Sequence, residues 1–95
     1  MKILNINYPI GLSVSRYEGD LDYTITGNLA KEYRIRDFDG AYDFEDYIKK
    51  HVNCEGIRFD SEYSQFFAYA RSEKRAKKFA QDVNDWFDKI KDLIA

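Results

Sequence analysis

Residues 72–94 read SEKRAKKFAQDVNDWFDKIKDLI, and this stretch decides the fold class. Its apolar residues recur every three or four positions, which is the period of a helix that buries one side. Ser72 stands directly before the pattern, where its hydroxyl can cap the first helical turn. The sequence therefore predicts a helix from about 72 to 93. Its buried side comprises Ala76, Phe79, Ala80, Val83, Trp86, Phe87, Ile90, Leu93 and Ile94.

The segments that precede this helix show the two-residue alternation of half-buried strands. Residues 12–26 are predicted to form a β-hairpin that turns at Glu18-Gly19-Asp20. Its apolar positions are Leu12, Val14, Leu21, Tyr23 and Ile25. Further strands are expected at 2–6, 31–36, 57–59 and 65–70, the last being apolar on both sides and so expected in the middle of a sheet, covered on both faces.

A shorter helix is predicted from about 43 to 52. Asp43 is its expected N-cap, with Tyr42 and Tyr47 placed to form a hydrophobic staple. The apolar side is formed by Phe44, Tyr47, Ile48 and Val52, and Asn53 and Gly56 end the helix.

Strands, a helix, a strand pair and a long helix in this order are typical of an α+β fold. With 95 residues, the chain is expected to form one domain over 1–95: an antiparallel sheet of four or five strands with one short and one long helix. The predicted core comprises Val14, Tyr23, Ile25, Ile48, Phe59, Phe67, Tyr69, Phe79, Val83, Trp86 and Ile90.

Catalytic and metal-binding motifs are sparse. His51 and Cys54 are the sole histidine and cysteine, whereas a structural zinc site needs four ligands. Asp60 and Glu62 are explained by a hairpin turn, and no glycine-rich phosphate loop is present. We therefore expect a non-enzymatic protein without cofactor or metal. The single cysteine, and the lack of an export signal or a long apolar run, favour the cytoplasm.

Acids and aromatics alternate between residues 37 and 47, a stretch that contains no basic residue. Carboxylates held between aromatic side chains can imitate the phosphates of a nucleic acid toward a basic groove. The other explanation is a solvated loop and helix start that favour acids. The candidate partner-binding residues are Asp37, Asp39, Tyr42, Asp43, Glu45 and Asp46.

Bases crowd the start of the long helix, where the helix dipole prefers acids. This departure from a local rule marks a second candidate surface, which could grip nucleic acid or an acidic partner. It comprises Arg71, Lys74, Arg75, Lys77 and Lys78. A solvated helix face would also explain it, and the net charge of −2 argues against a dedicated nucleic-acid binder.

The stretch GIRFDSEYSQFFAYA at 56–70, continuing through Arg75-Ala76, Phe79 and residues 83–87, resembles small proteins of phages and mobile elements in low-GC Gram-positive bacteria. Among these, proteins of this size are often anti-CRISPR proteins, which resemble one another in being small, rich in tyrosine, often acidic and non-catalytic, and which share no common fold. The resemblance implies an inhibitor of a host RNA-guided CRISPR nuclease that acts as a DNA mimic, without binding nucleic acid or membrane itself. The alternative is a small nucleic-acid-binding regulator that uses the basic start of the long helix.

Overall fold

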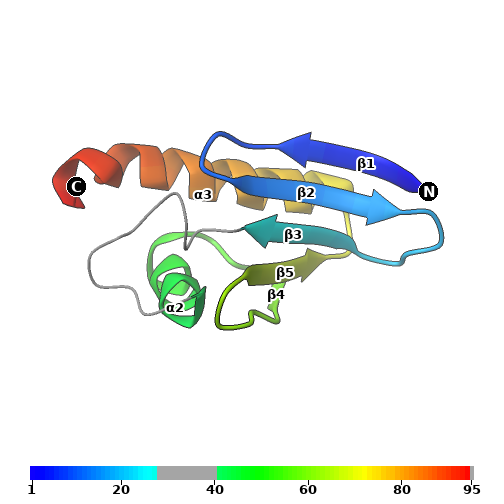
Figure 1. Cartoon of the computed structure of the whole chain (residues 1–95), viewed down its shortest axis with the longest axis horizontal. Coiled ribbons are helices and arrows are strands. Elements are labelled where there is room, and N and C mark those ends of the chain that lie inside the picture. Colours follow the sequence, from blue (N-terminus) through cyan, green and yellow to red (C-terminus); the bar gives the residue numbers. More distant parts are fainter. Residues whose placement is uncertain (28–40, 95) are drawn as a thin grey trace.

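The computed structural model describes residues 1–27 and 41–94, and the described part is an α+β domain (Figure 1). The strands are β1 (Lys2–Asn7), β2 (Leu12–Tyr17), β3 (Tyr23–Gly27), β4 (Arg58–Phe59) and β5 (Phe66–Ala70). The helices are α2 (Ala41–His51) and α3 (Glu73–Ile94). The predicted fold class, with its short and its long helix, is confirmed. The expected strand at 31–36 lies outside the described residues.

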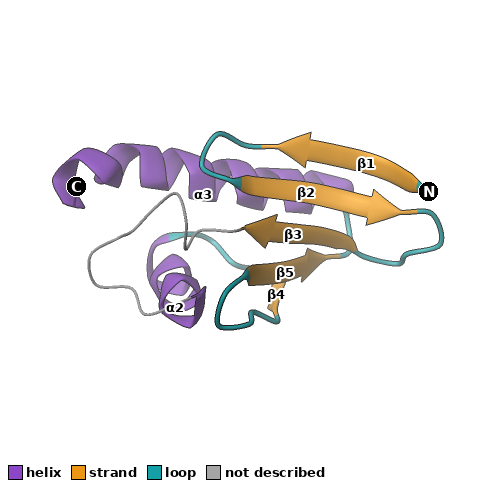
Figure 2. Cartoon of the chain, in the orientation of Figure 1, coloured by secondary structure: helices purple, strands orange, loops and turns teal. Residues whose placement is uncertain are grey.

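The strands form one antiparallel sheet in the order β1-β2-β3-β5-β4 (Figure 2). The predicted hairpin joins β2 to β3, and Gly19 in its turn has a φ of 92°, a backbone conformation that glycine adopts without steric cost. Strand β5 lies between β3 and β4, so its antiparallel pairing with β3 joins the two described segments, 1–27 and 41–94, in one sheet.

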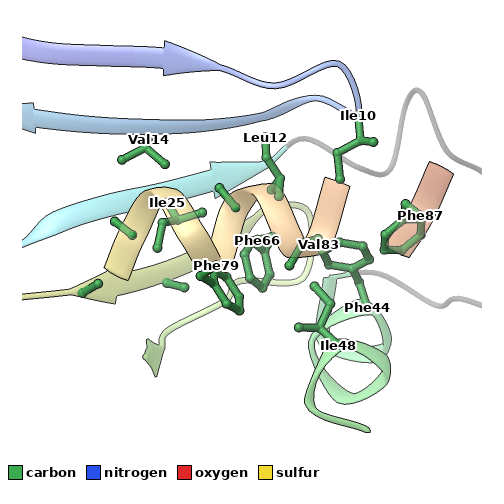
Figure 3. Packing of buried hydrophobic residues seen from close by; sticks show 14 of the residues in the cluster. Ile10, Leu12, Val14, Ile25, Phe44, Ile48, Phe66, Phe79, Val83 and Phe87 are labelled. Atoms are coloured by element: carbon green, nitrogen blue, oxygen red, sulfur yellow. The ribbon is translucent and has the colours of Figure 1, made fainter. Parts of the chain in front are cut away.

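One face of the sheet carries the core, and α3 packs across β2, β3 and β5 on that face (Figure 3). The register aligns buried side chains in rows: Val14 lies opposite Ile25, which lies opposite Ala68. Ala76, Ala80 and Val83 of α3 are fully buried. Small side chains on both the helix and β5 let the two backbones approach closely, and the burial of apolar surface stabilises the arrangement.

Phenylalanine rings from α2, α3, β4 and β5 pack together within the core. Phe66 of β5 lies edge-to-face with Phe44 of α2, at 5.2 Å between ring centroids, and 6.0 Å from Phe59 of β4. The ring centroids of Phe44 and Phe87 of α3 are 4.9 Å apart, and those of Phe59 and Phe79 of α3 are 6.0 Å apart. These rings, which we call the phenylalanine cluster, bring both helices onto the same face of the sheet.

Side-chain hydrogen bonds fix the start and the middle of α3. The Ser72 hydroxyl accepts a hydrogen bond from the Arg75 backbone N–H at 3.1 Å, which confirms Ser72 as the N-cap. Further along, the Asn84 side-chain oxygen accepts a bond from the Ile10 N–H, and the Tyr8 hydroxyl donates to the Lys77 carbonyl. The loop between β1 and β2 is thereby tied to the helix.

The structure corrects the predicted orientation of β5. Phe66, Ala68 and Ala70 point into the core, whereas Phe67 and Tyr69, which were predicted in the core, lie half-buried on the opposite face. That face carries no helix in the described ranges, so β5 is central in its pairing but helix-covered on one side. Both sides of this strand are apolar, so the sequence pattern does not decide which side faces the core. The prediction chose Phe67 and Tyr69 over the smaller Ala68 and Ala70.

The remaining predicted core residues divide into three groups. Val14, Ile25, Ile48, Phe79 and Val83 are fully buried, as expected. Tyr23, Phe59 and Trp86 are half-buried and pack against the core from its margin. The Ile90 side chain is outside the described residues. Leu21, which was expected on the apolar side of the hairpin, is 78% exposed because it lies in the turn before β3 begins.

The start of α2 is also corrected. The helix begins at Ala41, two residues before the prediction, so Asp43 lies inside its first turn and is not the N-cap. The staple predicted between Tyr42 and Tyr47 required Asp43 as the N-cap. Because Tyr42 lies inside the helix, these two residues do not occupy staple positions. In the first turn the Asp43 carboxylate still stands near the positive end of the helix dipole. Neither described helix is both long and apolar enough to cross a lipid bilayer.

We predict that Val83→Asp unfolds the protein. The new carboxylate would lie at a fully buried position between α3 and the sheet, and the cost of burying an unpaired charge exceeds what a domain with roughly 5–15 kcal/mol of stability tolerates. Lys74→Asp is the matched control, because it places the same side chain at an exposed position of α3. A thermal melt of Val83→Asp that equals that of the wild type would contradict the assigned core.

Candidate partner-binding surface

A hydrogen bond at the start of α2 joins two segments that each carry an exposed tyrosine. The backbone N–H of Ala41 donates a hydrogen bond of 2.9 Å to the carbonyl of Tyr63, in the turn between β4 and β5. This bond places Tyr42, which is 49% exposed, on a segment adjacent to Tyr63, which is 60% exposed. It also satisfies an N–H group of the first helical turn, which has no partner within the helix itself.

Acidic side chains flank these tyrosines. Asp46 follows Tyr42 by four positions, so both lie on the same side of α2, and Asp46 is exposed. Glu62 precedes Tyr63 and is exposed in a tight turn that its own backbone closes with Gln65. We call Tyr42, Asp46, Glu62 and Tyr63 the tyrosine surface.

The structure separates the acidic residues that the sequence grouped. Asp46 and Tyr42 are exposed and Asp43 is half-buried. The Glu45 side chain is only 14% exposed and forms an ion pair of 3.4 Å with Lys49, so its charge is already engaged within the helix. Asp37 and Asp39 lie outside the described residues. The acidic stretch is therefore represented at the described surface mainly by Asp46, with Tyr42 beside it.

Sequence reasoning missed Glu62 and Tyr63 as members of this surface. Glu62 was explained as a turn residue, and Tyr63 was assigned only to the turn itself. Each lies some twenty positions beyond Tyr42 in the chain, and the contact that joins the two segments is a backbone hydrogen bond, which leaves no mark in the sequence. The one available signal was the count of eight tyrosines, because tyrosine is enriched among the residues that dominate binding energy.

The basic residues at the start of α3 are held mainly by partners within the chain. Lys78 contacts Asp82 at 2.8 Å and Lys77 contacts Glu73 at 3.6 Å, both along the helix. Arg71 lies 3.1 Å from Asp22, a carboxylate that also binds Arg58. The attraction to these carboxylates offsets the unfavourable interaction of the basic side chains with the positive end of the helix dipole. Lys74 is exposed.

Arg75 has a structural role of its own. Its guanidinium donates to the backbone carbonyls of Asn53 and Glu55, each at 2.6 Å, in the turn that follows α2. The planar group with several donors suits two carbonyls at once. Arg75 therefore links the start of α3 to the end of α2, and Gly56 in the same turn adopts a φ of 75°.

His51 and Cys54 serve the packing near the end of α2. The His51 ring stacks on Trp86 of α3 at 4.9 Å between centroids, and Tyr47 contacts both rings. Burial raises the pKa of the Cys54 thiol, with an opposing effect of the nearby Arg75 and Lys49 charges. The thiol therefore stays protonated at neutral pH. Within the described ranges, no three His, Cys, Asp or Glu side chains gather as a metal site would require.

Comparison with known proteins gives no match for this chain, whether to a protein-family model, to a curated protein or to a solved structure.

We predict that Arg75→Met lowers the free energy of unfolding by about 1–2 kcal/mol, because the Asn53 and Glu55 carbonyls lose a charged donor. Methionine keeps most of the apolar stem, so the change reports on the hydrogen bonds. Lys74→Met, one position earlier, is the control and should leave the urea midpoint unchanged. Equal midpoints for the two variants would show that Arg75 does not hold the turn after α2.

Proposed function

We propose that this protein is a non-catalytic binding protein that docks on a basic surface of another protein through the tyrosine surface. The observation that carries the proposal is the hydrogen bond between Ala41 and Tyr63, which gathers two exposed tyrosines from distant parts of the chain. Tyrosine is enriched among the residues that dominate binding energy, since it buries a large area and retains a polar hydroxyl.

The charge of the tyrosine surface suits a partner rich in arginine or lysine. Asp46 and Glu62 are both exposed and lie on the two segments that carry the tyrosines. Neither forms an ion pair within the described residues, in contrast to Glu45. Carboxylates without an ion-pair partner among the described residues attract a basic groove and fix the orientation of docking.

The resemblance to phage-borne inhibitors makes a host RNA-guided CRISPR nuclease the proposed partner. Such enzymes hold nucleic acid in a positively charged channel and read a short DNA motif with arginines. An acidic surface with tyrosine anchors would occupy one of these places and exclude the DNA. In this proposal the protein acts in the cytoplasm of the bacterial host as a mimic of DNA.

The alternative function, a regulator that binds nucleic acid through the start of α3, has less support from the contacts. Lys77, Lys78 and Arg71 have carboxylate partners, and Arg75 is bound to backbone carbonyls. Binding a phosphate backbone would require these groups to exchange partners. A gel shift with bare duplex and single-stranded DNA at low salt separates the two functions, since only the regulator should bind.

The site is tested by reversing the charge of Asp46 and Glu62. We predict that Asp46→Lys and Glu62→Lys each weaken inhibition of DNA cleavage by a guide-loaded nuclease, and that the double variant weakens it by about 100-fold or more, because attraction becomes repulsion. The assay titrates the protein against a panel of guide-loaded nucleases from Gram-positive bacteria and measures the concentration that halves cleavage.

Glu18→Lys is the matched control. It makes the same charge change in the turn between β2 and β3, at the opposite end of the molecule from α2 (Figure 1). Inhibition that falls equally in Glu18→Lys and in the two test variants would indicate a general effect of net charge and would contradict a local surface. Inhibition that is lost on reversing Lys74 and Lys78, but not Asp46 and Glu62, would assign binding to the start of α3.

A further inference from the structure

Strand β1 leaves one edge of the sheet open. It is the outermost strand in the order β1-β2-β3-β5-β4 and pairs with β2 on one side (Figure 2). In the described ranges, no strand pairs with its other side. The opposite edge is the two-residue strand β4, so β1, with six residues, offers the longer edge for pairing with another chain.

The hydrogen bonds of β1 show which backbone groups face this open edge. The Tyr8 N–H donates to the Leu12 carbonyl at 2.7 Å, directly beyond the pair formed by Asn7 and Ser13. In antiparallel pairs, hydrogen-bonded positions alternate with positions whose N–H and C=O point away. Leu4 and Ile6 therefore bond to β2, whereas the backbone groups of Asn5 and Asn7 point to the open edge.

Most of this edge lacks the devices by which proteins block unwanted pairing. Proteins protect edge strands with charged side chains, prolines or bulges. In β1 the charge of Lys2 and the register shift between Lys2 and Leu4 both lie at the N-terminal end. Residues 4–7 read Leu-Asn-Ile-Asn, without a charge or a proline.

We propose that β1 pairs antiparallel with β1 of a second copy of this chain, with Asn5 opposite the same residue of its partner. This register places Leu4 opposite Ile6 of the second copy, on the core face of the sheet. Leu4 packs against the core, and Ile6 is half-buried opposite the buried Val14. Each would bury its remaining exposed area against the other, and the two sheets would join into one.

The sequence of β1 favours a second copy over another partner. Twofold pairing requires a strand that is complementary to itself, with each position i opposite j and each j opposite i. With Asn5 on the twofold axis, Leu4 and Ile6 meet on the core face. On the other face the two Asn5 amides meet, and Asn7 falls opposite Ile3. Lys2 falls opposite Tyr8, so no two like charges meet across the pair.

The test is the molar mass in solution, measured by sedimentation velocity over concentrations up to about 1 mM. The wild type should shift with concentration from 11.3 kDa toward twice that mass. Asn5→Pro removes the N–H that faces the partner strand, and Asn5→Lys brings two like charges together on the axis. Both variants should stay at the monomer mass.

Asn5→Thr is the control, since threonine keeps the N–H and suits a strand, and it should dimerise like the wild type. Circular dichroism of each variant at low concentration shows whether the monomer keeps its fold, and Asn5→Lys retains every backbone group in case proline disturbs β1. A wild type that remains monomeric throughout, or a dimer that persists in folded Asn5→Lys, would overturn the proposal.

Discussion

The phenylalanine cluster around Phe66 is the constraint on which the rest of the molecule depends. Phe66 is fully buried and lies between Phe44 of α2 and Phe59 of β4, while Phe87 and Phe79 bring α3 to the same place. A domain of this size buries a limited share of its surface, so a few large side chains must supply much of the apolar contact. Opposite Phe66 in the register stands Gly27, which adds no side chain to the core face.

The candidate surface follows from this packing. Phe44 and Ile48 fix the inner side of α2, so Tyr42 and Asp46 are turned outward. The turn between β4 and β5 lies beside the start of α2 because Phe59 and Phe66, on either side of that turn, pack in the same cluster as Phe44 of α2. The candidate surface thus forms from two segments that are not neighbours in sequence, and both segments are anchored by side chains in the core.

The elements with strong local signals could be predicted from the sequence. The long helix, its Ser72 cap and the hairpin with Gly19 follow from periodicity, capping and turn chemistry, and the structure contains all of them. The side of β5 that faces the core could not be predicted, because both of its sides are apolar and the register with β3 decides between them.

The start of α2 was hidden for a related reason. The N–H of Ala41, the first described residue of α2, is satisfied by Tyr63, a tertiary partner that no local sequence pattern indicates. For the same reason the sequence did not reveal Glu62 and Tyr63 as neighbours of the segment that carries Tyr42. For the basic residues, their position at the start of the long helix suggested a binding surface. The Lys78–Asp82 pair follows from the four-residue spacing of that helix, whereas the contacts of Arg75 with the turn after α2 are set by the tertiary fold.

The hydrogen bond between Ala41 and Tyr63 can be measured directly by amide hydrogen exchange in NMR. An N–H in the first turn of a helix ordinarily exchanges fast, because it has no partner within the helix. The structure predicts that the Ala41 amide is protected to a degree comparable with that of Val52, whose N–H bonds to Ile48 within the same segment. Exchange of Ala41 at the rate of an unstructured peptide, with Val52 protected, would contradict the joining of α2 to the β4–β5 turn.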